Sequence, residues 1–522
     1  MKTSVAFLVC IPIVCCFISS SANGMLGPLD TVIISNLTEM KYLGSVDERY
    51  QSYNVEMVEI VGGNFWRPYK TMDSLPSSTS SFDFSSEQMF RKVPPVNLAT
   101  KRLMNLVEGL APAYVRVSGS WANAVYFQNN DSAQAKAPKG FANTLTRNQW
   151  KGVIDFINAT NSKLVTSFAV SKGVRDANGV WTPEEAQKIV SYTKSLGSKI
   201  AGAELFNEPT IPIAGGVDTN YNGQNFAQDV AVFRAWAKKE VPDMLLIGPG
   251  STAEGIPGQF FAGLIKQFVT TDSLMSPKPK PLFDIFSYHY YGAMSMRAVR
   301  SGPFSIKAEN ALDPEWLQRT NVVADYYIGL RDKYNPGKPL WVTETAEASQ
   351  GGDPFATTYL DCFRYLYQLG SLAKKGIQVV MHNTLAASEY SLIDQDTHLP
   401  KPNYWAALLW AKLMGTKVYE AGKGASGIYL FAHSMKGYND GMTLLVLNTN
   451  KVSSKINIPS KGKQYTLTSN ELQGNSVQLN GEDLKLSDDD VLPAITGKKI
   501  NAGNVEIPPA SITFITFENA GK

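Results

Sequence analysis

Two glutamates, Glu208 and Glu344, each follow a short apolar run of the kind that forms a buried strand. One run, residues 202–206, leads into Asn207-Glu208-Pro209, and the other, residues 339–343, leads directly into Glu344. If both runs are strands of one closed parallel sheet, their carboxyl ends lie on the same rim and the two side chains face one pocket. Paired carboxyl groups in one pocket are what the hydrolysis of a glycosidic bond requires.

In this chemistry one carboxyl group must be protonated, to donate to the leaving oxygen, and the other must be ionised, to attack the anomeric carbon. The separation of the two groups decides the stereochemistry. A distance of about 5 to 5.5 Å gives retention, whereas a wider gap leaves room for water and gives inversion. Asn207, beside Glu208, is suited to hydrogen-bond a sugar hydroxyl next to the reacting carbon.

The elements that would position these residues follow the pattern of a (β/α)8 TIM barrel, an α/β fold, because short apolar runs and amphipathic segments alternate eight times. Strands are expected at residues 53–60, 113–117, 164–170, 202–206, 244–247, 283–288, 339–343 and 377–381. Helices are expected at residues 148–158, 182–196, 225–239, 256–268, 316–334 and 359–375. The barrel is predicted to span residues 49–416, with a Ser- and Pro-rich insertion at residues 64–95.

Beyond about residue 417 the pattern changes to short β-rich runs separated by Gly, Asn, Asp and Pro, which predicts a C-terminal β-sandwich over residues 417–522. The runs are residues 427–432, 442–447, 455–458, 465–468, 476–479 and 511–517. A further strand is expected at residues 30–35, before the barrel. We therefore expect residues 25–48 to join the sandwich.

The first 24 residues have the character of a signal peptide: Lys2, an apolar stretch at residues 5–18, and small polar residues before a cleavage point. We expect a secreted protein, with a lysosomal or periplasmic location in some hosts; an uncleaved anchor is the alternative. Cleavage leaves Cys362 as the only cysteine, and we expect it to be a buried thiol without a disulfide partner. Glycans are expected in a eukaryotic host at the asparagines of three sequons, Asn36, Asn130 and Asn158.

The composition argues against several partners. A formal net charge of +3 on 522 residues gives no basis for binding nucleic acid. Outside the signal segment no run reaches the ~20 apolar residues of a membrane span, so we expect no stable membrane insertion. The four histidines, at positions 289, 382, 398 and 433, lack metal-ligand spacing, so we expect no metal and no other cofactor. The oligomeric state is left open.

Several stretches resemble one family of retaining barrel glycosidases, glycoside hydrolase family 79, which contains the heparanases and β-glucuronidases. The resemblance starts from Asn207-Glu208 and Glu344 at the ends of expected strands four and seven. It continues through residues 110–119, 288–291, 344–345, 351–352, 379–381, 390–394, 403–405, 413–418 and 476–481. It therefore covers the chain from about residue 50 to the C-terminus.

The resemblance implies cleavage at a β-D-glucuronic acid unit, in a polysaccharide or a smaller glucuronide. It implies that Glu208 is the acid/base and Glu344 the nucleophile of a two-step retaining mechanism. The backbone amides of Gly351 and Gly352 and the hydroxyl of Tyr390 would then hold the glucuronate carboxylate, because a carboxylate favours N–H and O–H donors in a fixed cradle.

Three further residues are expected at the site. Glu56, on the first expected strand, would accept a hydrogen bond from a sugar hydroxyl. Tyr288 and His289 end the sixth expected strand, and one of them would hydrogen-bond Glu344. The alternatives are a strand-end charge for Glu56, a structural histidine for His289 and a core aromatic residue for Tyr390.

One difference from the mammalian heparanase pattern is the short segment between residues 127 and 145, about 17 residues where those enzymes carry a long excisable segment. The chain therefore resembles the single-chain microbial members, among which endo and exo action both occur. Basic residues along an extended cleft would favour long sulfated chains. Candidates near strand ends are Lys139, Lys172, Arg175 and Arg297, and the alternative for each is a solvated surface charge.

Two other functions compete with a retaining β-glucuronidase. Another member of the same clan, such as a glucanase or xylanase, would lack the carboxylate cradle. A catalytically inactive, glycan-binding relative would lack one of the two glutamates, yet both are present.

Overall fold

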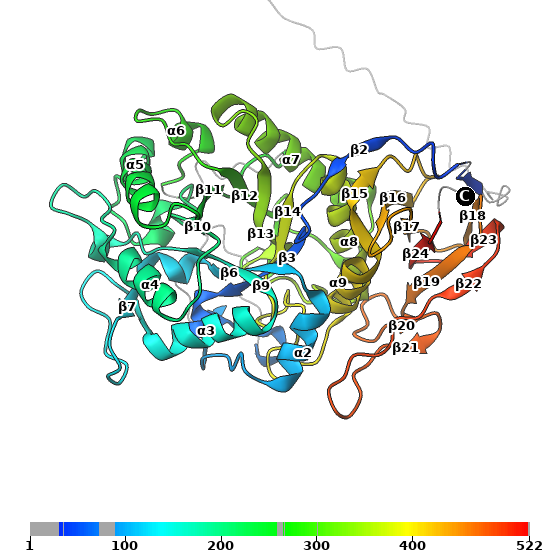
Figure 1. Ribbon diagram of the computed structural model, residues 1–522, viewed down its shortest axis with the longest axis horizontal. Helices are drawn as coiled ribbons and strands as arrows, with labels where there is room; N and C mark the ends of the chain where they lie inside the picture. Colours follow the sequence, from blue (N-terminus) through cyan, green and yellow to red (C-terminus); the bar gives the residue numbers. More distant parts are fainter. Residues whose placement is uncertain are drawn as a thin grey trace, which may run out of the picture.

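The computed structural model describes residues 31–519 except 35, 73–88, 258–264, 266 and 300. Eight parallel strands close into a barrel in the order β10-β11-β12-β13-β14-β3-β6-β9 (Figure 1). They are β3 (Gln51–Glu56), β6 (Ala113–Ser118), β9 (Ser162–Ser167), β10 (Gly202–Glu204), β11 (Leu245–Ser251), β12 (Ile285–Met294), β13 (Leu340–Ser349) and β14 (Val379–His382). The predicted (β/α)8 fold is confirmed, and each strand contains or overlaps a predicted run.

Helices surround the barrel: α1 (Met57–Val61), α2 (Lys101–Leu110), α3 (Arg147–Ala159), α4 (Glu184–Ser195), α5 (Gly223–Glu240), α6 (Thr271–Met275), α7 (Pro314–Tyr334), α8 (Tyr359–Lys374) and α9 (Pro402–Leu413). Two predictions were wrong in detail. The first strand ends at Glu56, because α1 begins at Met57 as a buried turn. In the segment predicted as a helix at 256–268, the few described residues are not helical, and the others lie outside the described residues.

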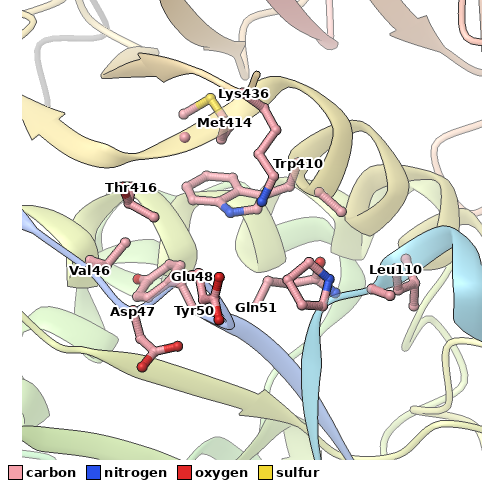
Figure 2. A pocket seen from close by; sticks show the side chains of 14 residues that line it. Val46, Asp47, Glu48, Tyr50, Gln51, Leu110, Trp410, Met414, Thr416 and Lys436 are labelled. Atoms are coloured by element: carbon pink, nitrogen blue, oxygen red, sulfur yellow. The ribbon is translucent and has the colours of Figure 1, made fainter. Parts of the chain in front are cut away.

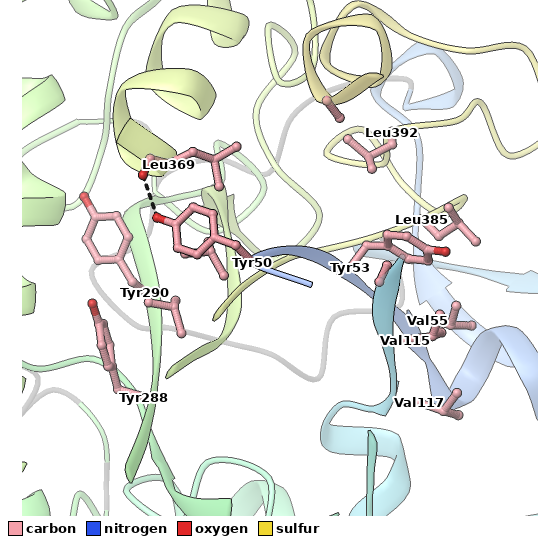
Figure 3. Packing of buried hydrophobic residues seen from close by; sticks show 14 of the residues in the cluster. Tyr50, Tyr53, Val55, Val115, Val117, Tyr288, Tyr290, Leu369, Leu385 and Leu392 are labelled. Carbon is pink, nitrogen blue, oxygen red and sulfur yellow. Dashed lines mark hydrogen bonds between the residues drawn. The ribbon is translucent and has the colours of Figure 1, made fainter. Parts of the chain in front are cut away.

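The apolar layer between the barrel and its helices is lined by large aromatic side chains. Tyr50 and Tyr53 from β3 and its approach, and Tyr288 and Tyr290 from β12, lie in this layer (Figure 3). The hydroxyl of Tyr50 donates a 2.5 Å hydrogen bond to the carbonyl of Leu369, which ties the start of the first barrel strand to α8. Cys362, in the same helix, is free and buried, as predicted.

The C-terminal strands form two sheets, as the sequence predicted. The larger contains β2 (Tyr42–Ser45), β15 (Met414–Tyr419), β16 (Ile428–Met435), β17 (Met442–Asn448), β19 (Gly462–Thr468), β20 (Gln478–Leu479), β21 (Glu482–Asp483), β22 (Lys498–Ile500) and β24 (Ser511–Phe517). The smaller contains β1 (Thr31–Ile33), β18 (Ser454–Ile458) and β23 (Gly503–Ile507). Residues of the N-terminal segment take part in both sheets, because β1 pairs with β18 and β2 pairs with β15.

The larger sheet is covered on both faces. One face packs on the smaller sheet through buried side chains such as Leu444 and Ile456. The other packs on the barrel helices, where the ring of Tyr367 in α8 lies 5.0 Å from that of Tyr429 and 5.7 Å from that of Phe431. Because α8 lies between barrel and sheet, nearly all of its residues are buried. The barrel and sandwich are therefore joined by a continuous core.

A small hollow lies at the amino-terminal ends of β3 and β6, between the barrel and the sandwich (Figure 2). Its lining includes Gln51, Pro112, Trp410 and Lys436. Its volume of about 30 Å³ is room for roughly one water molecule, too little for a sugar. The carboxyl ends of the strands, where barrel enzymes bind their substrates, lie at the opposite end.

The predicted signal peptide, residues 1–24, lies outside the described residues. Among the helices that the structure describes, none combines the length and apolar character needed to cross a bilayer. The described parts of the predicted insertion at residues 64–95 contain a short hairpin, β4 (Gly63–Trp66) paired with β5 (Phe90–Val93), and the 3-10 helix η1 (Tyr69–Thr71).

Candidate active site

Glu208 and Glu344 lie together at the carboxyl end of the barrel, although they come from opposite halves of the catalytic domain. Glu208 follows β10, and Glu344 lies within β13. One carboxylate oxygen of each lies within 4.8 Å of the other. This spacing fits the short separation of retaining enzymes and falls below the ~6.5 Å at which inverting pairs begin. Glu208 has φ 58°, a left-handed conformation that non-glycine residues adopt rarely and that concentrates at functional sites.

Each carboxylate oxygen of Glu344 accepts one hydrogen bond. The hydroxyl of Tyr291 donates to Oε1 at 2.6 Å, and Nη1 of Arg116 donates to Oε2 at 2.9 Å. Both partners are buried or nearly so. They stabilise negative charge on Glu344 and hold its side chain in one orientation, which is what a nucleophile at this position needs.

Arg116, at the middle of β6, joins three strands beneath the pocket. Its Nε and Nη2 lie 2.9 and 2.7 Å from Oε2 of Glu204, and Nη2 also donates to Oδ1 of Asn207 at 2.7 Å. The other oxygen of Glu204 accepts from the hydroxyls of Ser287 and Thr343. Burial alone would raise the pKa of Glu204, but the charges of Arg116 and His289 and the hydrogen bonds from Thr343 and Arg116 together lower it. This buried ion pair is therefore fully hydrogen-bonded, and it fixes Arg116 with Nη1 directed at the nucleophile.

His289 lies between the two glutamates. Its Nδ1 is 3.1 Å from Oε1 of Glu208 and 3.7 Å from Oε2 of Glu344. Burial lowers the pKa of His289, but the neighbouring Glu344 and the hydrogen bond to Glu208 outweigh it and raise the pKa above its ordinary value. The sequence predicted a bond from this region to Glu344. The structure places His289 closer to Glu208, so the histidine orients the acid/base at least as much as the nucleophile.

The same three side chains, Glu208, His289 and Glu344, offer donor atoms with the spacing of a metal site. Arg116 lies against two of them: Nη1 binds Glu344 at 2.9 Å, and Nη2 is 3.3 Å from Nε2 of His289. A guanidinium at these distances repels a cation and already occupies a ligand oxygen. The donor set therefore fits a proton-transfer site better than a metal centre.

The predicted binding role of Tyr288 is wrong. Its ring is fully buried and stacks on Tyr327 of α7 at 4.3 Å. Tyr288 lies in the apolar layer with Tyr290 (Figure 3). The register between β12 and β13 shifts between Tyr288 and His289. Because strand residues alternate between faces, His289 and Tyr291 point into the pocket and Tyr288 points away. Tyr291 makes the bond to the nucleophile that was expected of its neighbours.

The structure brings Gly351 and Gly352 next to Tyr390. Both glycines have positive φ, 90° and 80°, and the amide of Tyr390 donates to the carbonyl of Gly351 at 3.3 Å. A Cβ on Gly351 would lie 2.5 Å from Oγ of Ser388 and 2.8 Å from Cβ of Trp66. The turn is therefore tightly enclosed and admits only glycine without movement of its neighbours.

Arg297 binds the carbonyl groups of this turn. Its Nη1 donates to the carbonyls of Gln350 at 3.2 Å and Gly352 at 2.8 Å, and the hydroxyl of Tyr69 donates to the carbonyl of Gly352 at 3.1 Å. Nη2 of Arg297 pairs with Glu389. These bonds anchor the carbonyl side of the turn and so fix its geometry.

Neither arginine among the four basic candidates is a solvated charge or a free site for sulfate. Arg297 is 2% exposed, and Arg175 pairs with the buried Asp229 at 2.9 Å. Lys172 pairs with Asp218 on the surface at 2.7 Å, and Lys139 is exposed. Arg175 and Arg297 therefore fit neither the sulfate-binding candidate role nor the alternative of a solvated surface charge.

Asn383, after β14, connects the glycine turn to the nucleophile. Its Nδ2 lies 3.0 Å from Oε1 of Glu56, 3.0 Å from the hydroxyl of Tyr291 and 3.2 Å from the hydroxyl of Tyr390. Burial, and then the charge of Glu344, raises the pKa of Glu56 well above its ordinary value. Both effects favour the protonated form of Glu56, which can donate as well as accept a hydrogen bond.

Sequence reasoning assigned no role to Arg116, Tyr291 or Asn383. Arg116 had a signal, because it is a charged residue inside an otherwise apolar strand of residues 113–117. Tyr291 lies two positions after His289, on the same face of the strand. Nothing local marks Asn383.

Comparison with known proteins agrees with this geometry. Residues 69–370 match the family model described as glycosyl hydrolase family 79, N-terminal domain. The chain belongs to glycoside hydrolase family 79. The match spans β6 through β13 and so contains both Glu208 and Glu344.

The relatives with similar sequences include a heparanase and a β-D-glucuronidase. The chain is 28% identical to a heparanase of Bos taurus, over 81% of this chain and 85% of the relative. It is 26% identical to a baicalin-β-D-glucuronidase of Scutellaria baicalensis, over 96% of this chain and 95% of the relative.

The fold also matches solved structures. A 4-O-α-L-rhamnosyl-β-D-glucuronidase from Fusarium oxysporum superposes with a TM-score of 0.57 at 12% identity, covering 94% of this chain and 99% of that one. At this identity the likeness supports the arrangement of barrel and sandwich alone.

Proposed function

We propose that this family 79 enzyme is a retaining β-glucuronidase acting on glucuronate-containing glycans or smaller glucuronides. The observation that carries the proposal is the approach of Glu208 and Glu344 to within 4.8 Å, with the nucleophile held by Tyr291 and Arg116. The named activities of the bovine and Scutellaria relatives support the choice of sugar. Secretion through residues 1–24 is part of the same proposal.

In the first step, a carboxylate oxygen of Glu344 attacks the anomeric carbon while the bond from that carbon to the leaving oxygen breaks. The leaving oxygen takes the proton of Glu208. The charge of Glu344 is lost in the resulting glycosyl ester, so Glu208 can act as a base in the second step. It takes a proton from water, the water oxygen bonds to the anomeric carbon, and the ester bond returns its electrons to Glu344.

Selection of glucuronate is assigned to the turn at Gly351-Gly352 and to Tyr390. The turn is rigid, and Tyr390 lies against it with its hydroxyl 3.2 Å from Nδ2 of Asn383. Backbone N–H groups and a phenolic O–H are suited to a carboxylate. A glucose or xylose unit has no carboxylate to bind there, which disfavours the glucanase and xylanase alternatives.

Turnover of nitrophenyl β-D-glucuronide, compared with the glucoside and the xyloside, tests the proposal. We expect the glucuronide alone to be an efficient substrate, and Glu344→Gln to reduce its turnover by about 10⁴-fold or more with unchanged thermal unfolding. Activity of Glu344→Gln within tenfold of the parent would reject the assignment of the nucleophile. Absence of turnover by the parent enzyme would favour the inactive glycan-binding alternative.

A second variant tests the acid/base. Glu208→Ala should retain activity on a dinitrophenyl glucuronide, whose leaving group needs no proton, far better than on a methyl glucuronide. Azide should then accelerate the second step and give the β-glucuronosyl azide, because a small anion can replace the water that Glu208 activates. A product of inverted configuration would contradict the retaining mechanism.

A further inference from the structure

Four aromatic side chains form a wall beside the predicted glucuronate cradle. They are Phe65 and Trp66 of β4, Phe90 of β5, and Trp121 of the 3-10 helix η3 (Ser120–Ala124). Trp66 stacks on Phe90 with ring centroids 4.9 Å apart, and Trp121 meets Trp66 at 5.9 Å and Phe65 at 5.0 Å. We call this set the aromatic wall.

The aromatic wall touches the cradle directly. A Cβ on Gly351 would lie 2.8 Å from Cβ and 2.9 Å from Cγ of Trp66. Trp66 also packs against the cluster of Ala346, Ala356 and Tyr390. There is consequently no room for a sugar ring between Gly351 and Trp66.

The wall lies on the side of the mouth away from the leaving group. Glu208 follows β10 and must stand beside the leaving oxygen. In the closed order of the barrel, β14 and β3 lie opposite β10 and β11, and the hairpin of β4 and β5 follows β3. A substrate therefore extends from the Glu208 side, where its aglycone departs, toward the aromatic wall.

The covalent structure of glucuronate determines which of its hydroxyl groups would lie next to the aromatic wall. C4 is bonded to C5, so a glucuronate with C1 at Glu344 and its carboxylate at Gly351-Gly352 would carry its C4 hydroxyl close to the cradle, where Trp66 lies against Gly351. In a longer glycan linked through O4, the chain continues at this hydroxyl toward the non-reducing end. Such a chain would have to pass through the space that Trp66 and its neighbours fill.

Bonds from two loops hold the hairpin in place. Nε of Arg297 donates to the carbonyl of Arg67 at 2.9 Å, and the amide of Tyr69 donates to Oε1 of Glu389 at 2.9 Å. On the other strand, Nη2 of Arg91 donates to Oε1 of Gln395 at 3.0 Å. The loops after β12 and β14 thus anchor both strands, so the wall is part of the scaffold.

We propose that the aromatic wall makes this enzyme exo-acting: it removes single, terminal β-D-glucuronosyl units and excludes glucuronate that carries a sugar on O4. This inference rests on the proposed β-glucuronidase function and decides between the endo and exo action that the sequence left open.

Two chromogenic substrates test it on the unmodified enzyme: nitrophenyl β-D-glucuronide, and the same compound with N-acetylglucosamine on O4. We expect kcat/KM for the capped compound to be lower by about 100-fold or more, because a filled subsite excludes the extra ring sterically. Values within tenfold of each other would overturn the exo inference and leave the β-glucuronidase function intact. Failure to cleave either compound would overturn the function, and the inference with it.

A substitution of Trp66 tests whether the aromatic wall causes this selectivity. Trp66→Ala should raise the capped-to-uncapped ratio of kcat/KM by about tenfold or more, since it removes the ring nearest the cradle. Tyr438→Ala, an exposed aromatic residue on the sandwich, is the control and should leave the ratio unchanged. A folded Trp66→Ala protein with the parental ratio would contradict the role of the wall. If Trp66→Ala does not fold, the comparison of the two substrates on the parent enzyme still tests whether the enzyme is exo-acting.

Discussion

Arg116 on β6 donates a 2.9 Å hydrogen bond to Glu344 on β13, while two other nitrogens of the same guanidinium bind Glu204 on β10. One buried cation thus joins the second, fourth and seventh barrel strands directly beneath the pocket. The position of the nucleophile therefore depends on a residue that contributes both to the stability of the barrel and to the charge of the site. The predictions below separate these contributions.

Replacing Arg116 should destabilise the fold and inactivate the enzyme. Arg116→Met leaves Glu204, which is fully buried, without its charge partner, so the free energy of unfolding should fall by roughly 3–5 kcal/mol. Chemical denaturation measures this loss. Arg116→Lys keeps the charge but cannot bind Glu204 and Glu344 together, so it should lose less stability and still have low kcat. A Met variant as stable as the parent would contradict the role of the ion pair.

Tyr291→Phe removes the 2.6 Å hydrogen bond to Oε1 of Glu344 without changing the volume of the ring. We expect kcat/KM to fall by about 10- to 100-fold with little change in thermal unfolding, because one charge-assisted hydrogen bond to a reacting group is lost. Tyr290→Phe is the matched control, since Tyr290 lies on the helix side of the same strand (Figure 3). Equal effects of the two substitutions would show that the bond does not act in catalysis.

Gly351→Ala should weaken binding of glucuronides. The new Cβ would lie 2.5 Å from Oγ of Ser388 at a φ of 90°, so the turn has to move. We expect KM for nitrophenyl glucuronide to rise by about tenfold or more. Gly337→Ala is a control with a similar φ of 77° and no atom within 4 Å, and it should change stability without changing KM. An unaltered KM in the folded Gly351→Ala protein would argue against the carboxylate cradle.

Glu59 should make the protein less stable as the pH rises. Burial raises the pKa of Glu59 to about 8, above the ordinary value for a glutamate. The folded state therefore binds the proton more tightly than the unfolded chain. Its contribution to stability is complete below the unfolded pKa, near 4.5, and is lost as the pH rises to about 8. Glu59→Gln should remove this loss, on the order of 5 kcal/mol, from the pH profile of unfolding.

Glu59→Gln should preserve the hydrogen bond that Glu59 makes at the start of α1. Oε2 of Glu59 accepts a hydrogen bond from the amide of Glu56 at the start of α1, and the amide oxygen of glutamine can accept the same bond. The denaturation midpoints of parent and variant should therefore agree near pH 5 and diverge above it. Parallel pH profiles would show that Glu59 does not titrate in this range.

The sequence alone determined the barrel, the sandwich and the rim on which Glu208 and Glu344 lie. These features follow from short-range patterns, because alternating apolar runs and amphipathic helices predict parallel strands, and carboxyl ends of such strands share one rim. Resemblance to family 79 placed Gly351, Gly352 and Tyr390 at the site, and the structure brings these three residues into contact with one another.

The tertiary structure alone decided which side chains face the pocket and what they touch. Alternation along β12 puts Tyr288 and Tyr291 on opposite faces, but a local pattern does not say which face lines the pocket; the closed barrel turns Tyr288 outward and Tyr291 inward. Arg116 and Arg297 have no acidic partner nearby in the sequence; the glutamates that pair with them come from distant strands and loops. Closing the barrel brings these groups together, so their burial and pairing are properties of the closed sheet and its loops.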